Sequence, residues 1–257
     1  MSRTRRFRRG TAILPSLFTV GNLFVGFWAI IRTFEGNYAA AAPLIAWAIV
    51  LDLLDGRIAR MTGTTSEFGA ELDSLSDAIS FGVAPALLAY AWGFSTMPRV
   101  GWLAAFLFAT CGVLRLARFN VQRHVIDGRF FVGLPIPAAA AQVAAWVNLF
   151  PQPLTDRRTV MVALVLLVMT SFLMVSTFRY WSFKKVDLRS RRSYIMVLGI
   201  ALLFLLVALH PEWVLLSVVS VYLLHGPIGF LIGGGTRPRG DEQPAALPEA
   251  APQNPGA

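Results

Sequence analysis

The chain has 257 residues, of which 56% are hydrophobic and only 14% are charged. Soluble domains carry about 25% charged residues, so this composition excludes an ordinary soluble protein and favours a bilayer environment. The net charge of +9 does not indicate a nucleic-acid partner, because the basic residues lie between apolar runs, as is typical of membrane topology signals. The single cysteine, Cys111, cannot form an intrachain disulfide.

Residues 1–12 are basic and are followed by a long apolar run. We expect them to form a cytoplasmic basic or amphipathic N-terminus. A cleaved signal peptide also begins in this way, but the length of the run and the further apolar runs behind it favour a retained first helix.

Apolar runs of roughly the 20 residues that a spanning helix needs predict eight membrane helices. The expected fold is an all-α polytopic membrane protein with a six-helix core, residues 13–185, and about two further helices in 186–233. The last two helices, which flank a His-Pro-Glu break, could instead be a re-entrant pair. The eight helices are expected near 13–32, 39–55, 70–92, 100–118, 134–150, 159–178, 194–209 and 212–233.

The tail, 234–257, is rich in Gly, Pro, Ala and Gln and is expected to be disordered and cytoplasmic.

The basic residues support an alternating arrangement with the N-terminus in the cytoplasm. Under that arrangement, all but four of the 23 Lys and Arg residues face the cytoplasm. The four on the other side are Arg32, Arg99, Arg157 and Arg158.

Four aspartates interrupt the apolar pattern. Asp52 and Asp55 are three residues apart, and Asp73 and Asp77 are four apart, so each pair shares one face of a helix. We expect the first pair to close the second helix and the other pair to open the third, across a connection of about a dozen residues. The four carboxylates should then converge at the cytoplasmic edge of the membrane.

Four close carboxylates need compensating positive charge, because a single mid-helix Asp costs about 2.5–3.5 kcal/mol to insert. Hard oxygen ligands favour Mg²⁺, Mn²⁺ or Ca²⁺, and phosphate groups are usual partners of Mg²⁺ held by few carboxylates. Helix capping, or pairing with Arg57 and Arg60, is the alternative for one isolated aspartate. It is a poor explanation of four aspartates at these spacings.

Small and polar residues beside the aspartates favour a phosphate-bearing ligand. Gly56 and Ala59 leave room beside the second helix, Arg60 offers a forked donor to phosphate, and Ser66 offers a hydroxyl. Gly69 is expected to let the second and third helices pack closely.

These residues form the pattern Asp-x-x-Asp-Gly-x-x-Ala-Arg, eight residues, then Gly-x-x-x-Asp-x-x-x-Asp, between Asp52 and Asp77. The pattern resembles the signature of the CDP-alcohol phosphatidyltransferases. The resemblance implies a six-helix core, often a homodimer, with two Mg²⁺ or Mn²⁺ ions held by the four aspartates. It also implies that Gly56, Arg60 and Ser66 contact a CDP-linked lipid and that Asp77 is the general base.

Resemblances that are less specific than the aspartate pattern extend over most of residues 10–185. They favour the bacterial-type phosphatidylserine synthases within the family. They imply transfer of the phosphatidyl group of CDP-diacylglycerol to L-serine in the bacterial inner membrane, with the site and both termini facing the cytoplasm. Relatives often have Pro-Asn where this chain has Pro15-Ser16, which leaves Thr19 and Asn22 as candidates for nucleotide contact. The stretches that carry these resemblances are 14–23, 115–120, 131–137 and 178–184.

The carboxylate of serine predicts a cationic partner near the cytoplasmic ends of the fourth and sixth helices. Each basic residue there has an alternative role in topology or in contact with lipid headgroups. The nearest alternative function is the same transfer to glycerol 3-phosphate, an inositol phosphate or choline. A cation transporter is a remote alternative, because transporter acids usually lie near the membrane midplane. The candidate serine-binding residues are Arg115, Arg118, Asn120, Arg123, Arg179 and Lys184.

Overall fold

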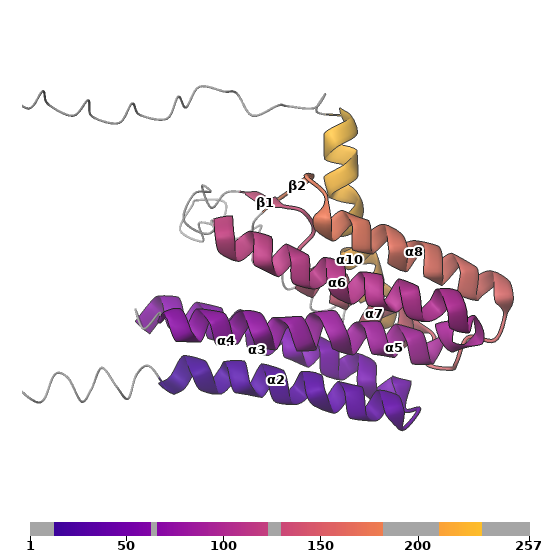
Figure 1. Ribbon diagram of the computed structural model, residues 1–257, viewed down its shortest axis with the longest axis horizontal. Coiled ribbons are helices and arrows are strands. Elements are labelled where there is room, and N and C mark those ends of the chain that lie inside the picture. Colours follow the sequence, from indigo (N-terminus) through magenta and orange to yellow (C-terminus); the bar gives the residue numbers. More distant parts are fainter. Residues whose placement is uncertain (1–12, 63–65, 123–129, 182–210, 233–257) are drawn as a thin grey trace, which may run out of the picture.

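The structure, a computed structural model, describes residues 13–62, 66–122, 130–181 and 211–232, and most of these residues are helical (Figure 1). Within the described ranges, six helical stretches are long and apolar enough to cross a membrane. The expectation of an all-α polytopic membrane protein is therefore confirmed. The helices are α2 Ile13–Phe34, α3 Tyr38–Thr62, α4 Glu67–Asp77, the π-helix η1 Ala78–Val83, α5 Ala84–Trp92, the 3₁₀ turn η2 Phe94–Thr96, α6 Pro98–Gln122, α7 Ile136–Leu149, α8 Arg157–Val175 and α10 Pro211–Ile232.

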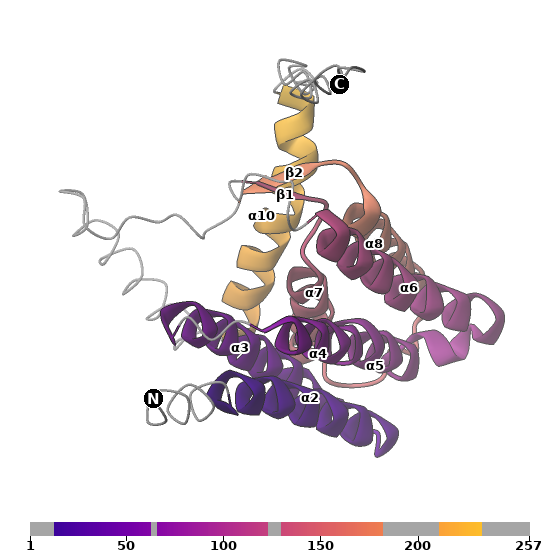
Figure 2. The ribbon, with the colours of Figure 1, turned by 60° about the vertical axis from the view of Figure 1, so that its left-hand side comes forward.

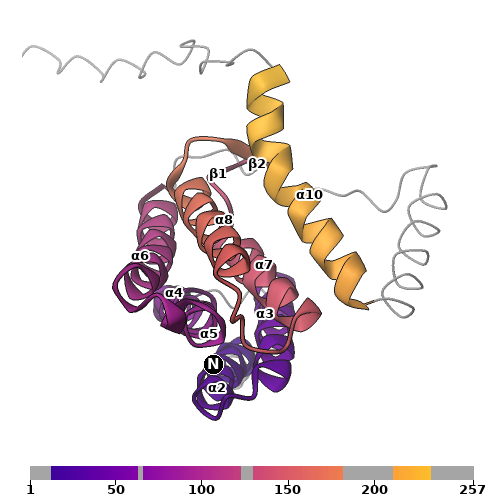
Figure 3. The same ribbon diagram turned by 90° about the vertical axis from the view of Figure 1, so that its right-hand side faces the viewer.

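A continuous helical rod built from α4, η1 and α5 forms the middle of the bundle, in contact with α2, α6 and α7 (Figure 3). Small side chains fill the helix interfaces, and Ala41, Ala48 and Ala139 are fully buried. Small residues let helix backbones approach closely in a membrane, where the hydrophobic effect does not drive helices together. Large apolar side chains such as Phe24 and Trp47 are exposed, as expected for a surface that faces lipid.

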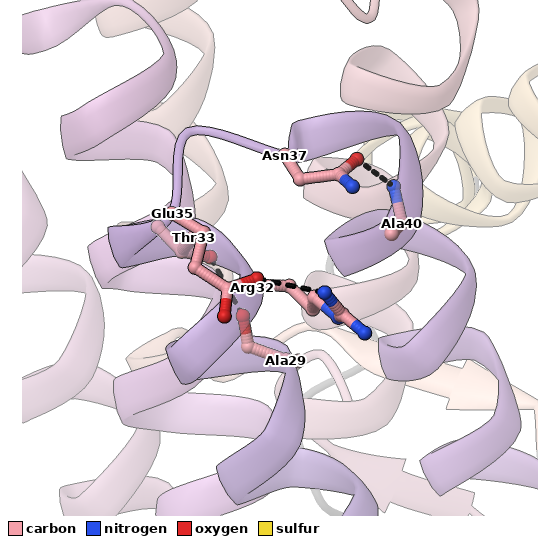
Figure 4. A network of polar contacts seen from close by, with 6 residues as sticks. All are labelled: Ala29, Arg32, Thr33, Glu35, Asn37 and Ala40. Atoms are coloured by element: carbon pink, nitrogen blue, oxygen red, sulfur yellow. Dashed lines mark hydrogen bonds and ion pairs between the residues drawn. The ribbon is translucent and has the colours of Figure 1, made fainter.

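The turn between α2 and α3 holds a small network of polar contacts (Figure 4), and it precedes α3, whose C-terminal half carries Asp52 and Asp55. Gly36 has a φ of 72°, a left-handed conformation that favours glycine. The Asn37 side chain accepts a hydrogen bond of 3.1 Å from the Ala40 N–H and so caps α3. Arg32 and Glu35 form an ion pair of 2.8 Å on the surface.

Other loops meet at this same end of the bundle. The Trp92 indole N–H donates to the Phe150 carbonyl at 2.7 Å, and the Trp92 carbonyl accepts from the Leu154 N–H at 2.8 Å. These bonds tie the end of α5 to the α7–α8 connection. The helices from α2 to α8 therefore alternate in direction, and the starts of α6 and α8 lie together at this end (Figure 1).

The helices that carry the aspartates extend further than the sequence analysis expected. The second helix continues to Thr62 rather than ending near 55, and the third begins at Glu67 rather than near 70. The reason is that the end of an apolar run is not the end of a helix. Arg57 and Arg60 are good helix formers, so the helix continues after its apolar face stops.

The fifth expected helix, 134–150, is shorter in the structure. It is α7, which has 14 residues and a length of about 21 Å. A two-stranded antiparallel sheet, which the sequence analysis did not predict, flanks it: β1, Phe130–Val132, pairs with β2, Arg179–Trp181. Gly133 follows β1 with a φ of 81°, and a Cβ there would collide with the carbonyl oxygen of Met174.

The C-terminal helix α10 is long and apolar enough to span a membrane, but it runs across the other helices rather than along them (Figures 1 and 3). It packs against α7 and β2 (Figure 2). The expected helix at 194–209, the basic segment 1–12 and the tail 234–257 lie outside the described residues.

Candidate active site

Three of the four aspartates bring their side chains together between α3 and α4. Each of Asp52, Asp55 and Asp73 offers a carboxylate oxygen that lies within 4.8 Å of the others. Asp55 is only 3% exposed, and Asp52 and Asp73 are half-buried. The spacing within α3 places Asp52 and Asp55 on one face, directed toward Asp73 of α4, so two helices build one acidic cluster.

Asp77 lies one helical turn after Asp73 and is 8% exposed. The Asn22 amide N–H donates to Asp77 Oδ1 at 3.2 Å. Asp77 also interacts electrostatically with Asp52, Asp73 and Asp55. It therefore belongs to the same charged group, but one of its oxygens is engaged by the protein.

Helix α2 supplies a polar wall for the aspartates. The Thr19 hydroxyl donates to Asp55 Oδ2 at 3.1 Å, and Asn22 reaches Asp77, so the two residues share one face of α2. Both side chains are buried. The sequence analysis expected them to contact the nucleotide, and the structure places them against the carboxylates.

Two serines tie the helix of Asp77 to α2. The Ser76 hydroxyl donates to the Thr19 carbonyl, and the Ser80 hydroxyl donates to the Asn22 carbonyl, each at 3.1 Å. The sequence analysis missed both serines. The available signal was their four-residue spacing on the helix of the aspartates, within an otherwise apolar run.

The helix widens immediately after Asp77. The Ala84 N–H bonds to the Ile79 carbonyl, five residues back, and the next residue, Pro85, has no N–H to donate. Short π-helical segments of this kind occur frequently at functional sites. Here the wide turn directly follows the aspartate and carries Ser80 toward α2.

The residues present fit a divalent cation. Several carboxylates with little solvent repel one another, and a cation offsets that repulsion. The Asn22 amide oxygen is buried and has no hydrogen-bond partner among the described residues, so a further hard oxygen lies close to Asp77. An all-oxygen donor set of this kind suits Mg²⁺, Mn²⁺ or Ca²⁺.

Arg115 brings positive charge to the cluster from α6. Its half-buried side chain interacts electrostatically with Asp77, Asp52 and Tyr222. Its guanidinium carbon lies 5.4 Å from the centre of the Phe119 ring, a cation–π contact. Among the candidate serine-binding residues that the structure describes, Arg115 therefore lies within electrostatic range of the aspartates.

The other candidates for the serine carboxylate have different surroundings. Arg118 donates to the carbonyls of Val175 and Ser176 at 3.4 and 3.5 Å, at the C-terminal end of α8. Asn120 donates to the Ser74 hydroxyl at 2.9 Å and so links α6 to the helix of Asp73. Arg179 lies in β2, and Arg123 and Lys184 lie outside the described residues.

The expected lipid-binding residues lie around the same end of α3 and α4. A Cβ on Gly56 would meet nothing within 4 Å among the described atoms, which agrees with open space beside α3. The Ser66 hydroxyl caps α4 by accepting from the Gly69 N–H at 3.0 Å, and a hydroxyl that accepts in this way can also donate its hydrogen to a ligand. Ala59 and Arg60 lie in the last two turns of α3.

Gly69 does not have the packing role that the sequence analysis expected. Among the described atoms, a Cβ on Gly69 would meet only the Ser66 hydroxyl, at 3.0 Å, and no atom of α3. The close approach between helices occurs instead at Gly26, which the sequence analysis missed and where a Cβ would collide with Ser80.

The bundle of long apolar helices and its buried acidic cluster define an integral membrane protein with a candidate metal centre. Residues 12–175 match the family model of CDP-alcohol phosphatidyltransferases, which covers more than half of the chain. The chain belongs to this family, and the four aspartates lie inside the matched segment.

Several curated relatives are named CDP-diacylglycerol–serine O-phosphatidyltransferase. The protein of Helicobacter pylori strain 26695 is 37% identical over 220 residues, which cover 85% of this chain and 91% of the relative. The protein of Methanocaldococcus jannaschii is 33% identical over 215 residues, which cover 84% and 92%. The protein of Mycobacterium tuberculosis strain H37Rv is 47% identical over 147 residues, which cover 54% and 50%.

Proposed function

We propose that this enzyme transfers the phosphatidyl group of CDP-diacylglycerol to the hydroxyl of L-serine, giving phosphatidylserine and CMP. The observation that carries the proposal is an acidic cluster within electrostatic range of Arg115, in a chain whose relatives, matched over most of their length, are named for this reaction. The aspartates suit the diphosphate end of the lipid nucleotide, and the arginine suits an acceptor that carries a carboxylate.

In this proposal the aspartates divide into two roles. Asp52, Asp55 and Asp73, together with Asp77, would hold two divalent ions, Mg²⁺ or Mn²⁺. Such ions supply positive charge that polarises a diphosphate and neutralises a phosphate leaving group. Asp77 is outside the group of three whose oxygens lie within 4.8 Å of one another, which favours a second role for its free oxygen.

Asp77 is the proposed general base. Asn22 donates to Asp77 Oδ1 and fixes the carboxylate, which leaves Oδ2 to accept a proton. The serine hydroxyl oxygen forms a bond to the lipid-side phosphorus as its proton passes to Asp77. The bond from that phosphorus to the CMP oxygen breaks, and CMP leaves with the electron pair.

The neighbours of the aspartates keep the carboxylates in place. Thr19 orients Asp55, and the two serine hydroxyls hold α4 and η1 against α2. Arg115 receives the serine carboxylate through its forked N–H donors. Gly56 leaves open space beside α3 for the nucleotide, with Ala59, Arg60, Ser66 and Gly69 along the same end.

The same proposal includes a location and an assembly. We infer a bacterial-type inner membrane, with the site and both termini on the cytoplasmic side. The distribution of basic residues supports this orientation. The family resemblance supports a homodimer, and the 13–185 core, the 186–233 helix pair and the 234–257 tail remain the proposed division of the chain.

A panel of acceptors tests the function. The full chain in vesicles with CDP-diacylglycerol and Mn²⁺ or Mg²⁺ is supplied with serine, glycerol 3-phosphate, inositol phosphate or choline. Formation of CMP and phosphatidylserine with serine alone is expected. Turnover with another acceptor, but not with serine, would reject the serine assignment and leave the family chemistry intact.

Divalent cations are expected to stabilise the fold as well as support turnover. A ligand that binds only the folded state at 100 times its dissociation constant adds about 2.7 kcal/mol. Mg²⁺ or Mn²⁺ should therefore raise the thermal unfolding midpoint of the wild type, measured in detergent at constant ionic strength. The Asp52→Asn/Asp73→Asn double variant should lose this increase, and an equal increase in both proteins would contradict the metal site.

A further inference from the structure

Helix α2 brings a buried amide to the acidic cluster. The Asn22 side chain is completely buried, and its amide N–H donates to Asp77 Oδ1 at 3.2 Å. The oxygen of the same amide, Asn22 Oδ1, has no hydrogen-bond partner among the described residues. A buried amide oxygen without a partner is costly to the fold, because it has lost its contact with water and gained no other. Asn22 Oδ1 is therefore a candidate ligand-binding atom.

The backbone that carries this amide is held in place from the helix of Asp77. The Ser80 hydroxyl donates to the Asn22 carbonyl, and the Ser76 hydroxyl donates to the Thr19 carbonyl, each at 3.1 Å. One turn after Asn22, Gly26 lies so close to Ser80 that a Cβ there would collide with it. A shift of α2 that gave the amide oxygen another partner would break these contacts.

The same face of α2 reaches the acidic cluster at a second point. Thr19 lies three residues before Asn22, so the two side chains share one face of the helix. The Thr19 hydroxyl donates to Asp55 Oδ2 at 3.1 Å, and Asp55 is one of the three aspartates whose oxygens lie within 4.8 Å of one another. Helix α2 therefore contacts the carboxylates of both α3 and α4.

The burial of the amide favours a small occupant over a substrate group. A hydroxyl or an ammonium group of the acceptor would have to reach an atom that is closed to solvent. A bare Mg²⁺ ion holds its oxygen ligands at about 2.0–2.1 Å, a shorter distance than any hydrogen bond. Carboxylate and carbonyl oxygens are the ligands that suit Mg²⁺ and Mn²⁺. The carboxylates beside the amide attract such an ion to it.

We propose that Asn22 Oδ1 is a direct ligand of a divalent cation held by the acidic cluster, so that α2, α3 and α4 together build the metal centre. The inference rests on the metal centre of the proposed function, and it adds a neutral ligand to the four aspartates. In this role the amide nitrogen donates to Asp77 while the amide oxygen binds the ion.

The test measures binding of Mn²⁺ alone to the full chain in detergent, without lipid or serine. Asn22→Ala should raise the Mn²⁺ dissociation constant, measured by EPR titration, at least about tenfold, because even the loss of an outer partner of a metal ligand costs about 10–100-fold. Pulsed EPR in deuterated water should detect an additional water on the ion, which takes the place of the amide oxygen. Asn22→Asp retains a side-chain oxygen and should bind Mn²⁺ at least as tightly as the wild type, with no additional water.

Two further variants separate a ligand from a residue that only positions Asp77. Asn37→Ala removes an exposed amide that caps α3, so it controls for general destabilisation and should leave the Mn²⁺ dissociation constant unchanged. In an Asp77→Ala background, Asn22→Ala should still weaken Mn²⁺ binding and add a water, because a ligand acts on the ion without Asp77.

The outcomes separate this inference from the proposed function. An unchanged number of bound waters in Asn22→Ala overturns the ligand role and indicates that a buried water satisfies the amide oxygen. Loss of the Asn22→Ala effect in the Asp77→Ala background also overturns it, because Asn22 then acts only through Asp77. If Asn22→Ala does not fold, weaker Mn²⁺ binding by Asn22→Asp overturns it instead. A wild type that binds no Mn²⁺ rejects the metal centre itself, before any variant is compared.

Discussion

At the scale of single residues, Asp77 is the proposed general base, and Asn22 donates to one of its two carboxylate oxygens. We predict that Asp77→Asn lowers kcat by about 10²–10⁴-fold, the usual contribution of a general base. Binding of CDP-diacylglycerol should persist, because three carboxylates remain. CMP release and lipid-nucleotide binding measure the two quantities.

The control for this variant is Asp156→Asn, the same substitution at the opposite end of the bundle. Asparagine also caps helices well, so the start of α8 should remain intact and turnover should stay close to that of the wild type. Normal turnover of Asp77→Asn would contradict its assignment as the base.

Asp156 also makes a prediction about pH. Hydrogen bonds from the Thr159 backbone N–H at 2.9 Å and from its hydroxyl at 2.8 Å hold the pKa of Asp156 below its ordinary value. A lowered folded-state pKa means that its stabilising contribution is complete above about pH 4 and is lost as the pH falls through the lowered pKa.

Unfolding midpoints between pH 7 and pH 3 check this prediction. Asp156→Asn keeps a cap that does not titrate, so the wild type should lose stability relative to the variant as the solution becomes acidic. Other acidic groups affect both proteins alike. Parallel pH curves for the two proteins would show that the capping bonds do not favour the ionised form.

The sequence predicted the aspartate pairs, because helical spacing is a local property that the chain displays directly. It did not predict that residues of α2 donate hydrogen bonds to these aspartates. Thr19 lies 36 residues from Asp55, and Asn22 lies 55 from Asp77. Contacts over such distances depend on how the helices pack, which periodicity does not reveal. The same limit explains why Arg115 could not be distinguished from Arg118.

At the scale of elements, α2 approaches the π-helical turn η1 closely at Gly26. A Cβ on Gly26 would collide with Ser80, including its Cα at 2.8 Å. We predict that Gly26→Ala destabilises the fold by about 1–3 kcal/mol, the usual cost of overpacking. The midpoint of thermal unfolding in detergent measures the effect.

Gly229→Ala in α10 is the matched control, because a Cβ there would meet nothing within 4 Å among the described atoms. Alanine in a helix is favoured over glycine by about 0.5–1 kcal/mol, so this variant should be neutral or slightly stabilised. Equal destabilisation of both variants would mean that the helical glycines are needed for another reason.

Element boundaries show where hydropathy is informative and where it is not. Apolar runs located α2, α3, α5, α6 and α8, but they placed the end of α3 too early and the start of α4 too late, because charged helix formers extend both helices beyond their apolar runs. The strands β1 and β2 have three residues each and pair across about fifty positions. Segments so short show no periodicity, so the sequence offered no signal for them.

At the scale of the whole molecule, the orientation can be tested by labelling. The chain has one cysteine, so Cys111→Ser gives a background for single introduced cysteines. Glu67→Cys lies at the aspartate end and Thr155→Cys at the opposite end, and both positions are exposed. The excess of basic residues at the aspartate end predicts that this end faces the cytoplasm.

A membrane-impermeant maleimide should label Thr155→Cys in intact spheroplasts and Glu67→Cys only in inverted vesicles. Detergent-solubilised protein, in which both sites should react, controls for local accessibility. The reverse labelling pattern would place the site on the outer side of the membrane and reject the proposed location.

The depth of the acidic cluster has a consequence for fidelity. Helix α3 continues for seven residues beyond Asp55, about 10 Å, so the carboxylates lie inside the bundle rather than at its rim. Asp77, only 8% exposed, meets few water molecules. A base that can activate an alcohol can also activate water, and hydrolysis would then destroy the nucleotide-activated lipid. Recessing the base therefore biases the competition between synthesis and hydrolysis toward synthesis.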